Sequence, residues 1–231
     1  DDLVTGVQTC ALPILVIGLL QLVLWQLAAA AGAGLAVQIP LVLALELWLT
    51  GGLHCDGVMD TADGLAAGPG RCLEAMKDSR VGASGVQALL QVLLLWVAAL
   101  ALLAAAAPWA LLWGAVWARL APLVAMQAFP YLRDPGSGSA AFHRQHWRGW
   151  LAELRPALLL LLALSGAALL LQAGPWWWLG WLGALPALLV PWQLGRRLGG
   201  HSGDSYGACV EWSLSWSLLL SGLALRCSWA G

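Results

Sequence analysis

The chain has 231 residues, of which 61% are hydrophobic and only 10% are charged, and its formal net charge is −1 at pH 7. A soluble domain carries about 25% charged residues because its surface faces water, so this composition excludes an ordinary soluble globular protein. Long apolar runs with almost no charge recur along the chain, which is typical of helices that span a lipid bilayer. The net charge argues neither for nor against nucleic acid, and we expect no nucleic-acid partner.

The first residues differ from the rest of the chain. Residues 1–13, DDLVTGVQTCALP, lack the basic start of a signal peptide and do not read as the start of a natural helix. They look like translated sequencing-adapter sequence joined to a truncated gene. We therefore expect residues 1–13 to be non-native and residues 14–231 to form one membrane-embedded domain.

Apolar runs rich in Leu and Ala predict an all-α, polytopic membrane bundle of about seven transmembrane helices, within a range of about six to eight. Pro108 and the pair Gly174-Pro175 are expected to mark tight turns between neighbouring spans. The second span is short and carries Glu46, so we expect it to be tilted or partly interfacial. The predicted spans are residues 13–31, 35–50, 84–107, 109–129, 150–173, 176–194 and 206–225.

The basic residues fall almost entirely in three connections that seven alternating spans place on one side of the membrane. By the positive-inside bias this side is cytoplasmic, and we expect a bacterial cytoplasmic (inner) membrane protein with its active-site loops on that side. Arg119, inside a span, and Arg226, near the C-terminus, are the exceptions. The basic residues that follow the second, fourth and sixth spans are Arg71, Lys77, Arg80, Arg133, Arg144, Arg148, Arg155, Arg196 and Arg197.

Aromatic and metal-binding residue types add little more. The chain has 16 Trp, many near predicted span ends such as Trp109, Trp113 and 176–178, where indole rings favour the lipid headgroup level. The five Cys show no CxxC pair, so we expect neither a disulfide framework nor a zinc site. The four His lack a metal-binding spacing such as HExxH.

Residues 51–85 carry the chemistry. In a helix, Asp56, Asp60 and Asp63 would lie at i, i+4 and i+7 on one face, where like charges repel. A divalent cation would offset that repulsion, and dense carboxylate oxygens suit Mg²⁺ or Mn²⁺ together with substrate phosphates. The alternative is a solvated acidic loop, but the many glycines, among them Gly57 and Gly64, favour close approach of the backbone to a helix or a ligand.

Residues 77–80, Lys-Asp-Ser-Arg, follow the aspartates and add cations. Lys77 is the only lysine in the chain. Lys77 and Arg80 can neutralise transferring phosphoryl oxygens, and Arg80 can offer two parallel hydrogen bonds to phosphate. The alternative is an ordinary surface salt bridge.

Two further polar islands open on the same side of the predicted membrane. Residues 130–138 form a turn-rich loop that carries Arg133, and residues 199–207 lead into the last span. Asp204 and Glu211 lie two helical turns apart and so share a face, which makes both candidate metal ligands. For Asp204, helix N-capping is an equally good explanation.

The motifs of residues 50–65 and 76–85, TGGLHCDGVMDTADGL and MKDSRVGASG, closely resemble the cobalamin synthase family, as do residues 129–142 and 199–211. The resemblance implies the last step of cobalamin nucleotide-loop assembly. In that step α-ribazole, or its 5′-phosphate, attacks the cobinamide-linked phosphorus of adenosylcobinamide-GDP, Mg²⁺ is required and GMP leaves. It implies those two substrates and a lipid bilayer as partners, and an oligomer is compatible with the sequence.

In this scheme Asp56, Asp60 and Asp63 are the metal ligands, with Asp78 either a further ligand or a residue that supports the ligands, and Asp204 and Glu211 as additional candidates. Lys77 acts in catalysis and, with Arg80, Arg133, Gly57 and Gly64, binds substrate phosphate. Either Asp63 or Asp78 is the candidate general base toward the ribose hydroxyl.

Two other functions compete with this one. A membrane phosphotransferase of the CDP-alcohol type would need D-G-x-x-A-R, but Asp56-Gly57 is followed by Val-Met-Asp-Thr. A cation-coupled transporter would place carboxylates near mid-membrane in repeated halves, and the sequence shows no such repeat. Both alternatives are therefore less favoured.

Overall fold

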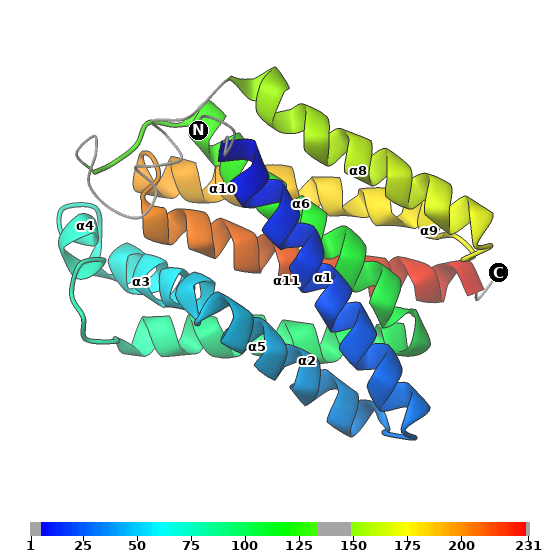
Figure 1. Ribbon diagram of the computed structural model, residues 1–231. Helices are drawn as coiled ribbons and strands as arrows, with labels where there is room; N and C mark the ends of the chain where they lie inside the picture. The colour runs from blue at the N-terminus through cyan, green and yellow to red at the C-terminus, as the bar shows by residue number, and fades with distance from the viewer. Residues whose placement is uncertain (1–5, 134–148, 230–231) are drawn as a thin grey trace.

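The computed structural model describes the backbone of residues 6–133 and 149–229, and in these ranges every regular element is a helix (Figure 1). The side chains are described for residues 16–133 and 149–227. The predicted all-helical fold is confirmed. The elements are α1 (Gly6–Ala30), α2 (Leu35–Thr50), α3 (Leu53–Ala67), α4 (Cys72–Ala75), α5 (Ala83–Leu103), η1 (Ala104–Ala106), α6 (Ala107–Ala128), α8 (Trp150–Leu170), α9 (Trp176–Leu179), η2 (Gly180–Gly183), α10 (Ala184–Leu198) and α11 (Gly203–Trp229).

Several of these helices are long and apolar enough to cross a membrane. Among the described residues, three stretches qualify: Ala83–Ala128, Trp150–Leu170 and Gly203–Cys227. The first comprises α5 and α6, between which the chain turns back at η1 (Figure 1). The bent pair Leu35–Thr50 and Leu53–Ala67 raises the number to up to four if it forms one span. The predicted count of about seven spans is therefore not confirmed.

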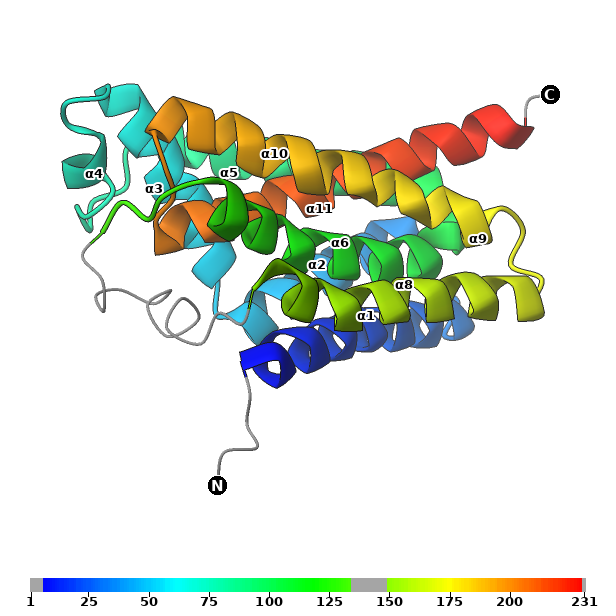
Figure 2. The same ribbon diagram turned by 90° about the horizontal axis from the view of Figure 1, so that it is seen from above.

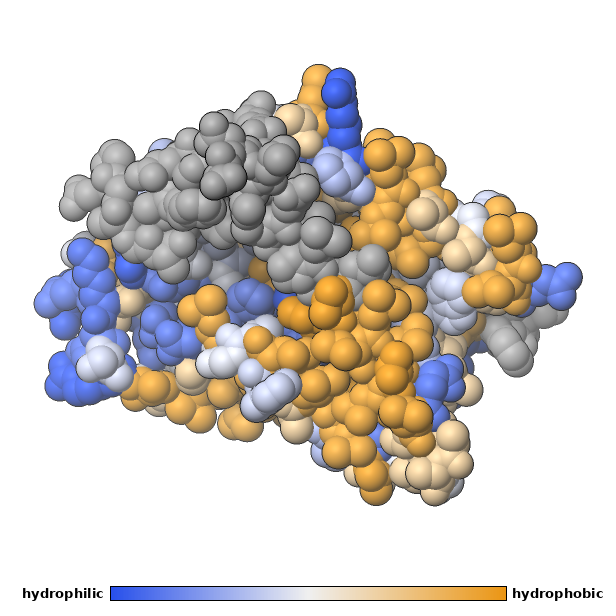
Figure 3. Space-filling model, in the orientation of Figure 1, coloured by the Kyte–Doolittle hydropathy of each residue, from blue (hydrophilic) through white to orange (hydrophobic). Residues whose placement is uncertain are grey.

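The apolar surface agrees with a lipid environment. The candidate span in α8 is only 11% buried, and it exposes leucines such as Leu159 and Leu162. In Figure 3 hydrophobic residues cover the central and right part of the visible face, whereas hydrophilic residues gather at the end that holds α4. Exposing an apolar surface of this extent to water is unfavourable, so it is suited to contact with lipid.

Helix α11 lies at the centre of the bundle and packs against α3, α5, α6 and α10. Seen from above, α6 lies between the α10–α11 side of the molecule and the outer helices α1 and α8 (Figure 2). The core contains Trp25, Trp96 and Trp113, each at most 2% exposed. Trp113 packs inside the bundle against Gly180 and Trp181, so this ring contacts protein, and the headgroup level of the Trp residues stays a prediction.

The acidic segment begins at a sharp bend between α2 and α3. Gly51 and Gly52 both have left-handed backbones, with φ of 60° and 72°, which glycine adopts without the steric penalty of a Cβ. Their N–H groups close the end of α2 on the carbonyls of Trp48 and Leu47. The axis turns by 87°, and α3 packs against α11 and α5. The first part of the expected connection is thus a helix built into the bundle.

Gly57 sets how closely α3 approaches α11. A Cβ added at Gly57 would lie 2.4 Å from the carbonyl oxygen of Asp204, so a side chain there meets backbone that cannot move aside cheaply. Gly57→Ala is expected to destabilise the protein by about 1–2 kcal/mol through this overpacking. Thermal unfolding in detergent measures the change. Gly166→Ala is the matched control, because Gly166 lies inside α8 with nothing within 4 Å of an added Cβ.

Equal melting temperatures for Gly57→Ala and Gly166→Ala would contradict this account of the α3–α11 contact. Alanine is favoured over glycine in a helix by about 1 kcal/mol, so the control should unfold no earlier than the unchanged protein.

Candidate active site

Asp56 and Asp60 form the accessible part of the aspartate face of α3. Asp56 is exposed and Asp60 is half-buried, and one helical turn separates them. Neither makes a hydrogen bond or an ion pair within the part of the chain that the structure describes. The carboxylates of Asp56, Asp204 and Asp63 and the guanidinium of Arg133 all lie near enough to act electrostatically on Asp60. The structure therefore brings Asp56, Asp204 and Arg133 near Asp60, and their roles in binding metal or phosphate stay predictions.

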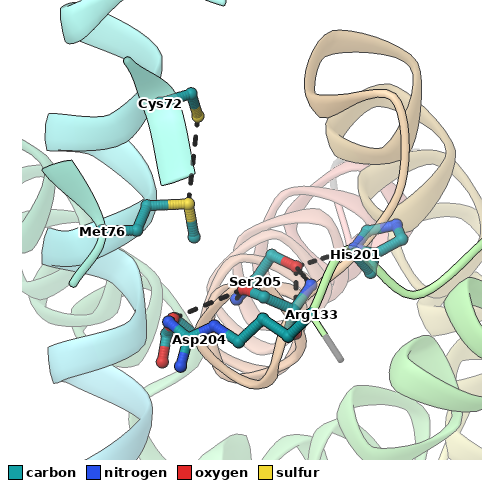
Figure 4. A network of polar contacts seen from close by, with 7 residues as sticks. Cys72, Met76, Arg133, His201, Asp204 and Ser205 are labelled. Carbon is teal, nitrogen blue, oxygen red and sulfur yellow. Dashed lines mark hydrogen bonds and ion pairs between the residues drawn. The ribbon is translucent and has the colours of Figure 1, made fainter. Parts of the chain in front are cut away.

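Arg133 and Asp204 form an ion pair beside these carboxylates (Figure 4). Nη2 of Arg133 donates to Oδ2 of Asp204, which also accepts from Oγ of Ser202 at 3.4 Å. Nε of Arg133 is buried and has no hydrogen-bond partner among the residues that the structure describes. An unpartnered guanidinium N–H is costly to bury, so this donor is available for an anionic ligand.

The capping alternative for Asp204 is not what the structure shows. Asp204 lies in the first turn of α11, and Oγ of Ser202 is the group that accepts from the N–H of Ser205, at 3.4 Å. Glutamate or aspartate in a first turn is still favourable next to the positive end of the helix dipole. Among the described residues the carboxylate of Asp204 pairs with Arg133 and with Oγ of Ser202, and with no backbone N–H of its own helix.

His201 anchors the loop between α10 and α11. It is fully buried, and its Nδ1 and Nε2 lie 3.0 Å from Oγ of Ser205 and the carbonyl oxygen of Pro191 (Figure 4 labels the first pair). Its backbone pairs with the segment that carries Arg133, through hydrogen bonds with Pro130 and Leu132 of 2.9 and 2.8 Å. Burial lowers the pKa of His201 to about 4, so the ring is neutral. His201 positions the Arg133 segment through its backbone hydrogen bonds. No His spacing in the sequence indicated this role.

Asp63 lies on the same face of α3 but is already bound by backbone. Its Oδ2 accepts from the N–H of Gly82 at 2.7 Å, and its Oδ1 accepts from the N–H of Gly85 at 2.8 Å. Gly82 is the N-cap residue of α5, so Asp63 satisfies free N–H groups at the start of that helix. Its predicted roles as metal ligand and base stay untested.

Lys77, Asp78 and Arg80 lie in the segment between α4 and α5. Asp78 and Arg80 form an ion pair of 2.6 Å, with side chains 38% and 88% exposed. Hydrogen bonds from Arg80 lower the pKa of Asp78 to about 2. Lys77 is exposed. The surface salt bridge proposed as the alternative is therefore present, and contact of these three residues with phosphate stays a prediction.

Two predicted site glycines contact protein in this structure. Gly57 meets the backbone of Asp204, and a Cβ at Gly64 would lie 2.4 Å from Cγ of Met76. Met76 is buried, with its sulfur 3.9 Å from that of Cys72 (Figure 4), and the contacts of Met76 and Cys72 with Gly64 hold α4 against α3. Packing explains both glycines without a ligand, and their predicted contact with phosphate is untested.

Glu211 shares a helix with Asp204 but contacts different residues. Its Oε1 lies 3.7 Å from Nδ1 of His54, in a buried group that also contains Glu46. Among the described residues, only Glu46, His54 and Glu211 have donor atoms that all lie within 4.8 Å of one another. The aspartates are less tightly gathered. Glu46 and Arg119 carry a signal that the prediction of site residues missed, because charged residues inside apolar spans are rare and usually paired.

Comparisons with known proteins point to one family. A family model described as cobalamin-5-phosphate synthase matches residues 3–222. An adenosylcobinamide-GDP ribazoletransferase of Prochlorococcus marinus (strain MIT 9303) is 53% identical over 219 residues, which is 91% of this chain and 83% of the relative. One of Synechocystis sp. (strain ATCC 27184 / PCC 6803 / Kazusa) is 43% identical over 201 residues, 82% of this chain and 73% of the relative. No solved structure matches the chain.

Proposed function

This chain belongs to the cobalamin-5-phosphate synthase family, and from that membership we propose how its aspartate site performs the family reaction. The enzyme joins α-ribazole, or its 5′-phosphate, to adenosylcobinamide-GDP and releases GMP. A ribose hydroxyl forms the new bond to the cobinamide-linked phosphorus, the bond from that phosphorus to GMP breaks, and the hydroxyl proton passes to a base. Because the relatives are named adenosylcobinamide-GDP ribazoletransferase, the CDP-alcohol phosphotransferase and transporter alternatives are not favoured.

The observation that carries the site is the pair of unpartnered carboxylates on α3, Asp56 and Asp60, beside Asp204 and Arg133. Mg²⁺ prefers hard oxygen donors and is commonly held by one or two carboxylates, several waters and substrate phosphates. The residues fit such an ion, because Asp56 and Asp60 lie one helical turn apart and neither carboxylate has a partner within the described residues. When bound, Mg²⁺ would neutralise the diphosphate and the charge that develops on the departing GMP.

Arg133 is the cation best placed to bind the diphosphate. Its pairing with Asp204 fixes the guanidinium near Asp60, and its buried Nε still lacks an acceptor. Lys77 and Arg80 would add positive charge from the exposed segment after α4. A guanidinium can bind two phosphate oxygens at once, so Arg133 orients the substrate as well as neutralising it.

The two candidate bases both carry partners. Asp63 accepts two backbone N–H groups, and Asp78 is paired with Arg80. An ionised carboxylate has about four acceptor sites, so these bonds leave room for the proton of a ribose hydroxyl. We retain both as candidates, with Asp63 favoured because it shares a helix with Asp56 and Asp60.

We place the site at the cytoplasmic face of a bacterial inner membrane. α4 and the ends of α10 and of the Arg133 segment lie at one end of the molecule, opposite η1 and α9 (Figure 1). Arg196 and Arg197 lie in the last turn of α10, at this same end. Basic residues concentrate on the cytoplasmic side of membrane proteins, and an amphiphilic corrinoid could reach this end from the lipid.

The direct test uses the full chain in detergent or liposomes with adenosylcobinamide-GDP, α-ribazole and Mg²⁺. We expect release of GMP that stops when a chelator removes the metal and returns when Mg²⁺ is restored. Absence of GMP release from folded protein, with either α-ribazole or its 5′-phosphate, would overturn the proposal.

Arg133→Lys should separate its phosphate contact from simple charge. Lysine keeps the positive charge but loses the planar fork, so kcat/KM for GMP release should fall about 10-fold while the protein stays folded. Arg197→Lys is the control, because Arg197 is exposed in the last turn of α10, and its activity should not change. Equal activity of the two variants would contradict the proposal that Arg133 binds the substrate diphosphate.

A further inference from the structure

A second polar cluster lies inside the bundle, away from the exposed aspartates. Glu46 comes from α2, His54 from α3 and Glu211 from α11. Glu46 is 4% exposed and Glu211 is 2% exposed. Arg119 of α6 and Gln21 of α1 border the group on the Glu46 side. Two consecutive helices, α2 and α3, and the distant α11 thus bring three side chains of metal-binding type to one point inside the bundle.

Within the described part of the chain, the facing atoms of the three side chains have no hydrogen-bond partners. These buried atoms are Oε1 of Glu46, Nδ1 of His54 and Oε1 of Glu211. These donor atoms lie within 4.8 Å of one another, and the His54–Glu211 pair is 3.7 Å apart. Buried polar groups are nearly always satisfied, so three unsatisfied atoms that face each other indicate a missing shared partner.

The charges of the cluster also do not balance. Gln21 donates to Oε2 of Glu46 at 2.8 Å, and Nη2 of Arg119 lies 3.7 Å from Oε1 of the same residue. Among the described residues no Lys or Arg forms an ion pair with Glu211, whose neighbours are His54 and Glu46, so the single guanidinium of Arg119 stands near two carboxylates. One buried carboxylate therefore lacks a compensating cation.

We propose that Glu46, His54 and Glu211 bind a divalent transition-metal ion of the Zn²⁺ or Mn²⁺ class, at a site separate from the aspartates. One imidazole nitrogen with two carboxylate oxygens is a donor set that such ions favour, whereas Mg²⁺ prefers oxygen alone. Ligands about 2.1 Å from a tetrahedral zinc lie about 3.4 Å apart, so the His54–Glu211 pair at 3.7 Å needs only a small side-chain shift, and the pairs with Glu46, which lie within 4.8 Å, close by rotation of that side chain. Water can complete the coordination.

The position of this site gives it a structural role. Glu46 lies one turn before the end of α2, and His54 lies just after the 87° bend that starts α3. A metal that joins both to Glu211 would fix the bend and the seating of α3 on α11. Asp56 follows His54 by two residues, so the buried metal positions the aspartate face without touching substrate.

Metal content of the purified full chain tests the proposal independently of activity. Chelator-stripped protein in detergent is titrated with Zn²⁺, passed over a desalting column and analysed by elemental mass spectrometry. We expect about one tightly held zinc per chain, lost in Glu211→Gln and His54→Gln. Glu74→Gln, at an exposed carboxylate of α4, and Asp56→Asn, in the aspartate site, should retain it.

A second measurement needs no variant. Co²⁺ added to the stripped protein should give visible absorption bands of a nitrogen–oxygen site and raise the melting temperature, and Zn²⁺ should displace it. The competing explanation is a proton on one carboxylate. In that case neither Zn²⁺ nor Co²⁺ binds, and Glu211→Gln melts at or above the temperature of the unchanged protein; this result overturns the proposal. Zinc lost with Asp56→Asn but kept in Glu211→Gln would overturn it as well.

Discussion

The Asp60→Asn variant is expected to release GMP at least about 100-fold more slowly than the unchanged enzyme while remaining folded. Asparagine keeps the size of aspartate but removes the charge that holds a divalent cation. Asp60 is half-buried and has no partner within the described residues, so no native hydrogen bond is lost. It also sits among the carboxylates of Asp56 and Asp204, and removing one of three neighbouring charges relieves repulsion. Stability should therefore be unchanged or slightly higher.

Two measurements distinguish loss of chemistry from loss of fold. The rate of GMP release is followed against Mg²⁺ concentration, and thermal unfolding in detergent reports on the fold. Half-saturation by Mg²⁺ should shift to higher concentration in Asp60→Asn, because one carboxylate ligand is gone. Glu74→Gln is the matched carboxylate-to-amide control at the surface of α4, where the carboxylate only meets Arg71 at 3.8 Å. If Asp60→Asn keeps most of its turnover at limiting Mg²⁺, the aspartates are not the metal site.

The helices could be predicted because bilayer-length apolar runs leave few alternatives. Residues 35–50 were predicted as a span and form α2 with the same bounds, and residues 84–107 and 109–129 correspond to α5 and α6. The number of spans could not be settled in this way. Hydropathy measures how apolar a segment is, but it does not show where a helix is interrupted. The single run predicted over residues 176–194 is divided into α9, η2 and α10.

The backbone of the acidic segment was harder to predict. The i, i+4, i+7 spacing of the aspartates is realised in α3, but two consecutive glycines allow a turn, a bend or a loop equally well. Only the left-handed φ values of Gly51 and Gly52 produce the 87° bend that turns α3 into the bundle. In the sequence, glycines next to aspartates suggest that the backbone contacts a ligand. In the structure, Gly57 and Gly64 instead lie where α3 packs against α11 and α4.

Which residues the charged side chains contact depends on tertiary structure, so these contacts could not be predicted from the sequence. Helical spacing places Asp204 and Glu211 on one face, yet two turns along α11 separate the Arg133 contact from the buried cluster of Glu46 and His54. Glu46 could have been singled out, since a carboxylate in an apolar span needs a partner. Which helix supplies that partner follows only from the packing.

Asp63→Asn is expected to destabilise the protein by about 2–3 kcal/mol, the largest effect on folding that the structure predicts for one side chain of the site. The two oxygens of Asp63 accept from the N–H groups of Gly82 and Gly85 at the start of α5. Asparagine offers one oxygen and one NH₂, so one backbone N–H would face another donor. A Cβ at Gly82 would lie 2.4 Å from Oδ1 of Asp63 and one at Gly85 2.6 Å from Oδ2, so the packed carboxylate has little room to rearrange.

Thermal unfolding of Asp63→Asn beside Asp78→Asn isolates this effect. Asp78 pairs only with Arg80, whose side chain is 88% exposed, and such surface pairs contribute at most about 1 kcal/mol. Asp63→Asn should therefore unfold several degrees below Asp78→Asn, with activity falling in proportion to the folded fraction if capping α5 is its whole role. Loss of GMP release at an unchanged melting temperature would instead assign Asp63 to the chemistry. Asp63→Asn could also prove less stable and, when assayed well below its melting temperature, inactive. That result would mean that the Asp63 carboxylate both caps the start of α5 and takes part in the chemistry at the metal-binding face of α3.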